Sequence, residues 1–366
     1  VNPLTIRKNM KLRFHFALML LLILSPGISA QDIFHTSICY DLLSTIDKFG
    51  EEDKLNEFYQ ETGLSNDSVF IACAAKVQKS VRASNLCNIY STSHSDKDDI
   101  RQCIDFFSKL DTINVPQEYK GAWLQRIVNV KEELITYLTA LHDAGYGKYW
   151  KENIEPVLLK SIENYEIRKT LIDSIHCEIN SLAGPEVLGN TYPKTYVLDI
   201  GNAFNLLDET FCTTYLLLDK EIAKKYRINF VQVYIHENLH RLNISPKTIQ
   251  KLEELKQSDD FYRVNEEKAR KFREGLNEAF VVAAESFISK RLGLKTQEDV
   301  YTEFSTYCDG TIVLAPIIYT HLEEKRSDET FDGFINRLFR EKKIDSGKIK
   351  EQYELAMESI KLNSVD

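Results

Sequence analysis

Glycine and proline are scarce in this sequence, which has 14 Gly and 8 Pro among 366 residues. Collagen-like and low-complexity chains need far more of both, so these classes are excluded. With 43% apolar and 28% charged residues, the chain has the composition of a folded protein with a substantial core. A Gly-rich phosphate loop of the Walker type and a G-x-S-x-G elbow are both absent, so neither kind of site is indicated.

No C-x-x-C pair occurs among the seven cysteines, so a cysteine-based zinc site and a thioredoxin-like redox motif have no support. An oxidising compartment would permit up to three disulfides and leave one thiol over. The cysteines are Cys39, Cys73, Cys87, Cys103, Cys177, Cys212 and Cys308.

Only one long apolar run is present, from Phe14 to Leu24, and it is too short to cross a bilayer comfortably. Basic residues precede this run and small residues up to Ala30 follow it, as in a secretory signal peptide. We therefore expect residues 1–30 to comprise upstream residues and a signal peptide that is cleaved after Ala30. The mature protein is then expected to be secreted or periplasmic and to have no membrane span.

Basic residues are in the minority, and the imbalance grows when the signal peptide is removed. Residues 1–30 hold four of the 46 basic side chains and none of the 55 acidic ones, so the mature net charge is 42 − 55, or −13. Such an acidic surface argues against nucleic acid and anionic membranes as partners.

Two regions of the chain differ in their sequence pattern. Residues 31–185 are predicted to form a helical N-terminal region, because apolar residues recur at helical spacing and Pro156 suits the first turn of a helix. Residues 186–366 begin with two predicted strands, Thr195–Ile200 and Phe211–Leu218, which are rich in β-branched and aromatic residues. Helical patterns dominate elsewhere, so the sequence predicts a predominantly α-helical α+β fold with a small sheet.

Two further helices are predicted, from about Phe230 to Leu242 and from about Glu274 to Leu292. The highly charged stretch between them, Lys247–Arg273, is interpreted as a solvated helix or a surface excursion. The first of the two helices carries His236-Glu237-Asn238-Leu239-His240, which matches the H-E-x-x-H pattern of zinc metalloproteases.

Histidines four residues apart lie one turn apart on the same face of a helix, so His236 and His240 can reach one metal ion. Glu237 lies about 100° around the helix, where its carboxylate can approach a metal-bound water without entering the coordination sphere. The metal lowers the pKa of that water, and Glu237 accepts its proton as general base when the water attacks a polarised carbonyl group. A stripe of apolar residues occupies a different face of this helix: Val231, Ile235 and Leu242. A purely structural role for both histidines stays open at this point.

Two histidines leave a zinc site short of a ligand, which is commonly a carboxylate from a following helix. Glu278 and Glu285 share one face of the otherwise apolar second helix, where an unpaired carboxylate would be costly. We favour Glu278 as the ligand, with Glu285 and then Glu274 as alternatives. The glutamate that is not a ligand could orient a histidine.

With these motifs the chain resembles the gluzincins, zinc metallopeptidases in which a glutamate from a downstream helix joins H-E-x-x-H, often in an Asn-Glu context such as Asn277-Glu278. The resemblance covers roughly Thr195–Leu292 and extends to a group of secreted bacterial zincins with a helical region ahead of the motif. It implies zinc as the cofactor, held by the two histidines and Glu278. The chain departs from the better-known members in the longer gap of 38 residues between His240 and Glu278, and in Val282, which stands where an acidic residue is expected.

Enzymes of this kind usually hold an extended substrate against an edge strand near the metal and stabilise the oxyanion with a second electrophile. Phe211–Leu218 is the candidate edge and Tyr319 or His321 the candidate electrophile, with an ordinary core strand and a core tyrosine as alternatives. The sequence therefore predicts a secreted zinc metallopeptidase that acts on a peptide or protein substrate, with a zincin-like catalytic region at residues 186–366. The alternative is a secreted helical binding or structural protein with a non-catalytic or degenerate H-E-x-x-H site.

Overall fold

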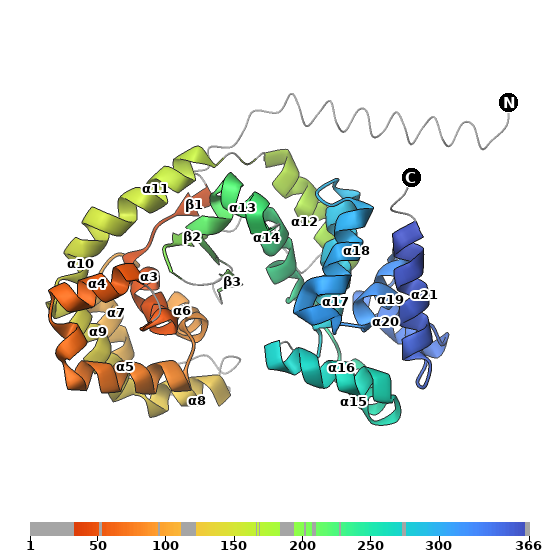
Figure 1. Cartoon of the computed structure of the whole chain (residues 1–366), viewed down its shortest axis with the longest axis horizontal. Coiled ribbons are helices and arrows are strands. Elements are labelled where there is room, and N and C mark those ends of the chain that lie inside the picture. Colours follow the sequence, from red (N-terminus) through yellow and green to blue (C-terminus); the bar gives the residue numbers. More distant parts are fainter. Residues whose placement is uncertain are drawn as a thin grey trace. The chain divides into compact units, whose positions relative to one another are not determined.

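The part of the chain that the structure describes is predominantly helical with a small four-stranded sheet (Figure 1), which confirms the predicted α+β class. The computed structural model describes residues 33–50, 53–93, 96–110, 122–165, 167, 169–183, 194–200, 203–206, 210–226, 228–272 and 276–362. The predicted signal peptide at 1–30 and the alternative ligand Glu274 lie outside these residues. Within them, no helix combines the length and the apolar character that crossing a bilayer requires.

The chain divides into two compact units, and neither unit is one continuous stretch of sequence. The described residues of 27–167 and 192–230 form the sheet unit, and those of 168–191 and 231–366 form the helical unit. The boundary predicted between residues 185 and 186 falls in a segment outside the described residues. The chain therefore passes between the two units more than once.

The small sheet consists of four short strands in the order β1-β2-β4-β3, with β1 at Phe34–His35, β2 at Thr195–Leu198, β3 at Phe204–Asn205 and β4 at Phe211–Thr214. β2 pairs in parallel with both β1 and β4, whereas β3 is antiparallel to β4. Phe211–Leu218 is not the candidate edge strand. β4 has a neighbour on each side, as the alternative of an ordinary core strand predicts, and Tyr215–Leu218 continues as a 3-10 turn. Composition signals a strand, but it carries no information about which strands flank it.

The sheet unit consists mainly of helices, and several of them begin at residues that suit a first turn. They are α3 (Ile38–Ser44), α4 (Asp53–Glu61), α5 (Ser68–Ser80), α6 (Ala83–Ser91), α7 (Ile100–Ser108), α8 (Ala122–Asn129), α9 (Lys131–Asp143), α10 (Tyr146–Tyr149), α11 (Glu155–Asn164) and α13 (Lys220–Tyr226). Asp67 and Asp99 cap α5 and α7, since each carboxylate accepts hydrogen bonds from two backbone N–H groups of the first turn. Pro156 lies in the first turn of α11, as predicted.

Aromatic rings fill much of the core of the sheet unit. Phe230 packs edge-on against Phe34 of β1 and Phe211 of β4, with ring centroids 5.0 and 6.0 Å apart. Farther along the chain, Phe70 of α5 stacks on Tyr137 of α9 at 5.2 Å. All five side chains are buried, so ring packing contributes to the core both at the sheet strands and among the N-terminal helices.

The helical unit is organised around one helix that is buried on every side. Its helices are α12 (Lys169–Ala183), α14 (Phe230–Leu239, of which all but Phe230 belongs here), α15 (Pro246–Ser258), α16 (Asp260–Ala269), α17 (Glu278–Arg291), α18 (Gln297–Thr306), α19 (Leu314–His321), α20 (Phe331–Arg340) and α21 (Ile349–Leu362). Every residue of α17 from Glu278 to Ser289 is buried, and α12, α18 and α19 pack against it. An all-round apolar helix needs such a central position.

The described residues of the charged stretch Lys247–Arg273 form α15, α16 and a short 3-10 turn. The interpretation of this stretch as a solvated helix is therefore correct in part. Ser245 caps α15, where Pro246 occupies the first helical position. A few apolar side chains of this stretch are nevertheless buried: Leu252, Leu255 and Tyr262. The two helices are therefore amphipathic surface helices rather than a fully solvated excursion.

All seven cysteines are described, and no disulfide joins any two of them in this structure. Cys39, Cys87, Cys103 and Cys212 are buried, and burial raises the pKa of the Cys87 and Cys103 thiols. Protonated, buried thiols behave as small apolar side chains, so these residues contribute to packing.

Candidate metal centre

Helix α14 directs its two motif histidines away from its buried row. That row contains Val231 and Ile235 of the predicted stripe, and Leu242 is buried just beyond the end of the helix. The side chains of His236 and His240 keep 19% and 35% of their surface exposed, so both are accessible from one side. The helix ends at Leu239 rather than at the predicted Leu242, because the N–H of His240 donates to the carbonyl of Glu237, three residues back, which closes a tighter turn.

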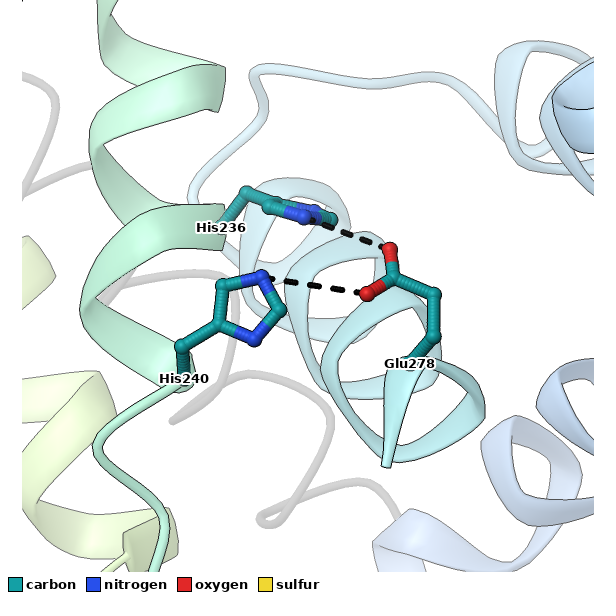
Figure 2. Close-up of side chains that lie close together, drawn as sticks. All are labelled: His236, His240 and Glu278. Atoms are coloured by element: carbon teal, nitrogen blue, oxygen red, sulfur yellow. Dashed lines mark ion pairs between the residues drawn. The ribbon is translucent and has the colours of Figure 1, made fainter. Parts of the chain in front are cut away.

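Glu278, the favoured third ligand, is the first residue of α17 and is 1% exposed. Its carboxylate points toward both histidines (Figure 2). Oε1 of Glu278 lies 3.4 Å from Nε2 of His236, and Oε2 lies 3.8 Å from Nε2 of His240. The two helices thus bring together three side chains that the sequence predicts as metal ligands.

The spacing of these three side chains fits a single small metal ion. Ligand atoms at about 2.1 Å from a tetrahedral zinc ion stand roughly 3.4 Å apart, so the observed separations of 3.4 and 3.8 Å are close to one edge of such a site. One ligand atom from each of His236, His240 and Glu278 lies within 4.8 Å of the other two. Two imidazoles and a carboxylate are also a donor set that zinc prefers.

Electrostatics favours a cation at this position. Burial lowers the pKa of His236 to about 3, helped by His240 and Lys295, and burial also lowers the pKa of His240. Both imidazoles are therefore neutral near pH 7 and present a lone pair, as ligands must. Neutral imidazoles bring no positive charge to the buried carboxylate of Glu278, whereas a divalent cation between the three side chains would compensate it.

Glu237, the predicted general base, is half-buried in the last turn of α14, next to His236. Successive residues of a helix point in directions about 100° apart, so Glu237 lies on a different face of α14 from His236, as the sequence predicts. Its role as a base remains a prediction.

Glu285, the alternative ligand, lies two turns further along α17 and has other partners. Its carboxylate accepts hydrogen bonds from Lys295 Nζ at 2.7 Å and from Ser289 Oγ at 2.8 Å. Lys295 also pairs with Glu303 at 2.5 Å, so the ammonium group bridges two carboxylates. Glu285 is thus held in a buried ion-pair network, which leaves Glu278 as the carboxylate beside the histidines.

Tyr319 and His321, the predicted electrophiles, lie in α19 with contacts of their own. The hydroxyl of Tyr319 donates to Gln297 at 3.4 Å, and its ring packs edge-on against Phe304. His321 pairs through Nδ1 with Glu324 at 2.9 Å. These contacts do not involve the His236, His240 and Glu278 side chains, so a role for either residue in the chemistry stays a prediction.

A described side chain that does contact the cluster is Tyr307, which the sequence pattern did not single out. Its hydroxyl donates to Oε1 of Glu278 at 2.7 Å, and its ring centroid lies 6.3 Å from that of His236. It follows α18 directly and begins a short turn, Tyr307–Gly310. The only local signal was Asp309-Gly310, a turn-forming pair that marks a chain reversal but says nothing about what the preceding tyrosine contacts.

Comparison of the chain with protein-family models, with characterised proteins and with solved structures finds no match. The case for a function therefore stands on the residues of this site and their geometry.

Proposed function

We propose that this protein is a zinc-dependent hydrolase of peptide bonds, related in mechanism to the gluzincins and exported from the cell. The observation that carries the proposal is the approach of the buried Glu278 carboxylate to the Nε2 atoms of His236 and His240. If the H-E-x-x-H pattern had arisen by chance, a buried carboxylate 38 residues later in the chain would not be expected beside its two histidines.

The proposed division of labour assigns three residues to the metal and one to proton transfer. His236, His240 and Glu278 would hold a zinc ion, which supplies Lewis acidity when it is bound. Glu237 accepts a proton from the attacking water and donates it to the leaving amine, as general base and then general acid. The substrate class, a peptide or protein, follows from the resemblance and not from a described pocket.

The first test is the metal content of the purified protein, measured by elemental analysis after exposure to stoichiometric zinc. We expect close to one zinc per chain, lost in His236→Ala and in His240→Ala. His142→Ala is the matched control, because His142 is a histidine of α9 in the sheet unit that contacts Arg101 and Asp143. If the parent protein takes up no zinc, or if His236→Ala keeps it, the metal site is refuted.

The second test separates an enzyme from a zinc-binding protein without catalysis. Glu237→Gln keeps the shape of the side chain but cannot accept a proton, so we expect retained zinc and a loss of hydrolysis of at least about 100-fold. The assay uses a mixture of internally quenched fluorescent peptides. Full activity in Glu237→Gln contradicts the mechanism, and a zinc-loaded parent with no activity on any peptide favours the binding-protein alternative.

A further inference from the structure

Tyr307 donates a hydrogen bond to Glu278, the proposed third ligand. Its hydroxyl bonds to Oε1 of Glu278, which is the same oxygen that faces His236 Nε2 at 3.4 Å. The last torsion of a glutamate side chain is soft, with broad and roughly two-fold preferences. A fixed donor on one carboxylate oxygen restricts this rotation, so that the two oxygens stay directed at the two histidines.

The turn that carries Tyr307 is under backbone strain. Cys308 and Asp309 have φ values of 49° and 57°, and Gly310 follows with 70°. Two successive non-glycine residues in the left-handed region are costly, and they persist only where the surrounding structure imposes them. Thr311 closes the turn, because both its N–H and its hydroxyl donate to the carbonyl of Cys308.

Glycine at position 310 is required on steric grounds as well. A Cβ atom there would lie 2.8 Å from the carbonyl oxygen of Ser305, which belongs to the last turn of α18. The chain therefore reverses tightly against the end of α18. Tyr307 lies at the start of this turn, where its hydroxyl reaches Glu278. Backbone strain is often retained where a side chain must stay in one place for function. Here the strained turn directly follows Tyr307 and fixes where its side chain leaves the backbone, beside the predicted ligands.

We propose that Tyr307 is a positioning residue that orients the Glu278 carboxylate for metal binding. The inference rests on the proposed function, since it takes Glu278 to be a zinc ligand. Tyr307 acts through Glu278 and needs no contact with substrate. Partners of this kind tune metal affinity because they fix the orientation of the ligand before the metal arrives.

The test is the zinc affinity of Tyr307→Phe, measured by competition with a chromogenic chelator. This variant keeps the ring and removes the hydroxyl, and we expect zinc to bind about 10- to 100-fold more weakly. Tyr301→Phe is the matched control, because Tyr301 lies on α18 six residues earlier and is half-buried. Its zinc affinity should stay within two-fold of the parent. Equal affinities for Tyr307→Phe and the parent overturn the proposal.

Two further measurements distinguish positioning from a general structural role. The visible spectrum of the cobalt-substituted protein reports ligand geometry, so it should change in Tyr307→Phe and not in Tyr301→Phe. In a Glu278→Gln background, where two histidines remain, Tyr307→Phe should have no further effect on zinc affinity. Additive losses, or a loss that only follows a lower melting temperature of the zinc-free protein, refute positioning through Glu278.

The outcome also separates this inference from the proposed function. If the parent binds zinc through His236 and Tyr307→Phe binds it equally well, only the positioning role fails. If the parent binds no zinc, the proposed function fails and there is no ligand for Tyr307 to orient, so both are refuted.

Discussion

Glu278 and Glu285 are buried seven residues apart on α17, and their carboxylates have different partners. Glu285 meets the ammonium group of Lys295, which also pairs with Glu303. Glu278 meets Tyr307 and the two neutral histidines. One buried carboxylate thus belongs to a structural ion-pair network and the other to the proposed metal site, although their sequence surroundings are equally apolar.

The ion-pair network predicts a large effect of removing its cation. Lys295→Met removes the ammonium group between the carboxylates of Glu285 and Glu303 and leaves both without their cation. We therefore expect the free energy of unfolding to fall by roughly 3 kcal/mol at pH 7.5. Urea unfolding measures this loss. Lys290→Met is the control, because Lys290 lies on the exposed end of α17, and its effect should stay below about 0.5 kcal/mol. Equal effects of the two substitutions would show that the network contributes nothing.

Asp41 in the sheet unit is another buried carboxylate, and it predicts a pH dependence. It accepts hydrogen bonds from Trp150 Nε1 and from the backbone N–H of Asp199, both at 2.8 Å. Burial raises the pKa of Asp41 to about 8, against the effect of these donors and with a contribution from the facing Asp199 carboxylate. The folded protein therefore keeps a proton on Asp41 over a range in which the unfolded chain has lost it.

The sign of this effect follows from proton linkage. Between the ordinary pKa near 4 and the raised value, the folded state binds more protons, so the free energy of unfolding falls as pH rises from about 4 to about 8, by at most about 6 kcal/mol. Asp41→Asn cannot titrate, so its unfolding free energy should decline less between pH 5 and pH 8 than that of the parent. Urea unfolding at both pH values measures the two slopes, and identical slopes would contradict a raised pKa.

At the scale of elements, helices were predicted well and strand neighbours were not. The H-E-x-x-H helix begins at Phe230 and the first turn of α11 contains Pro156, because periodicity and capping are local properties. Phe211–Thr214 is a strand, as its composition indicates. Its interior place between β2 and β3 depends on pairing with Thr195–Leu198 and Phe204–Asn205, which local composition does not encode.

Gly310, in the turn after α18, can be compared with Gly293, whose backbone conformation is similar. Gly310 and Gly293 have φ values of 70° and 72°, so alanine at either position adds left-handed strain of about 1–2 kcal/mol. Only at Gly310 does the added Cβ also meet a backbone oxygen, at 2.8 Å, whereas it meets nothing within 4 Å at Gly293. Gly310→Ala should therefore lower the melting temperature more than Gly293→Ala. Equal shifts would mean that the close approach at Gly310 relaxes without cost.

At the scale of the whole molecule, the two units interleave in sequence, and the predicted ligands all belong to the helical unit. Ligand binding to the folded state alone stabilises it by about 2.7 kcal/mol when free zinc is 100 times its dissociation constant. Zinc should therefore slow amide hydrogen exchange in α14 and in the first turns of α17, by up to about 100-fold.

The same experiment contains its own controls. Helices α5 and α9 of the sheet unit hold no predicted ligand, so zinc should slow their exchange less than that of α14 and α17. His236→Ala should abolish the protection of α14 and α17. Protection of α5 and α9 without protection of α14 and α17, or protection that survives His236→Ala, would place the zinc effect outside the proposed site.

The sequence by itself determined the features that depend on neighbouring residues. These are the helical character of most of the chain, the placement of two histidines on one helical face, and the presence of candidate carboxylates on a later buried helix. Spacing of four residues and apolar periodicity are properties of a single helix, so they need no knowledge of tertiary structure.

The tertiary structure alone decided which carboxylate meets the histidines and which residue orients it. Glu278 and Glu285 share one helical face, and only the packing of α17 brings the first to His236 and leaves the second with Lys295. Tyr307 reaches Glu278 across 29 residues of sequence through a strained turn. Such contacts arise from the packing of whole helices, and no local pattern in the sequence specifies them.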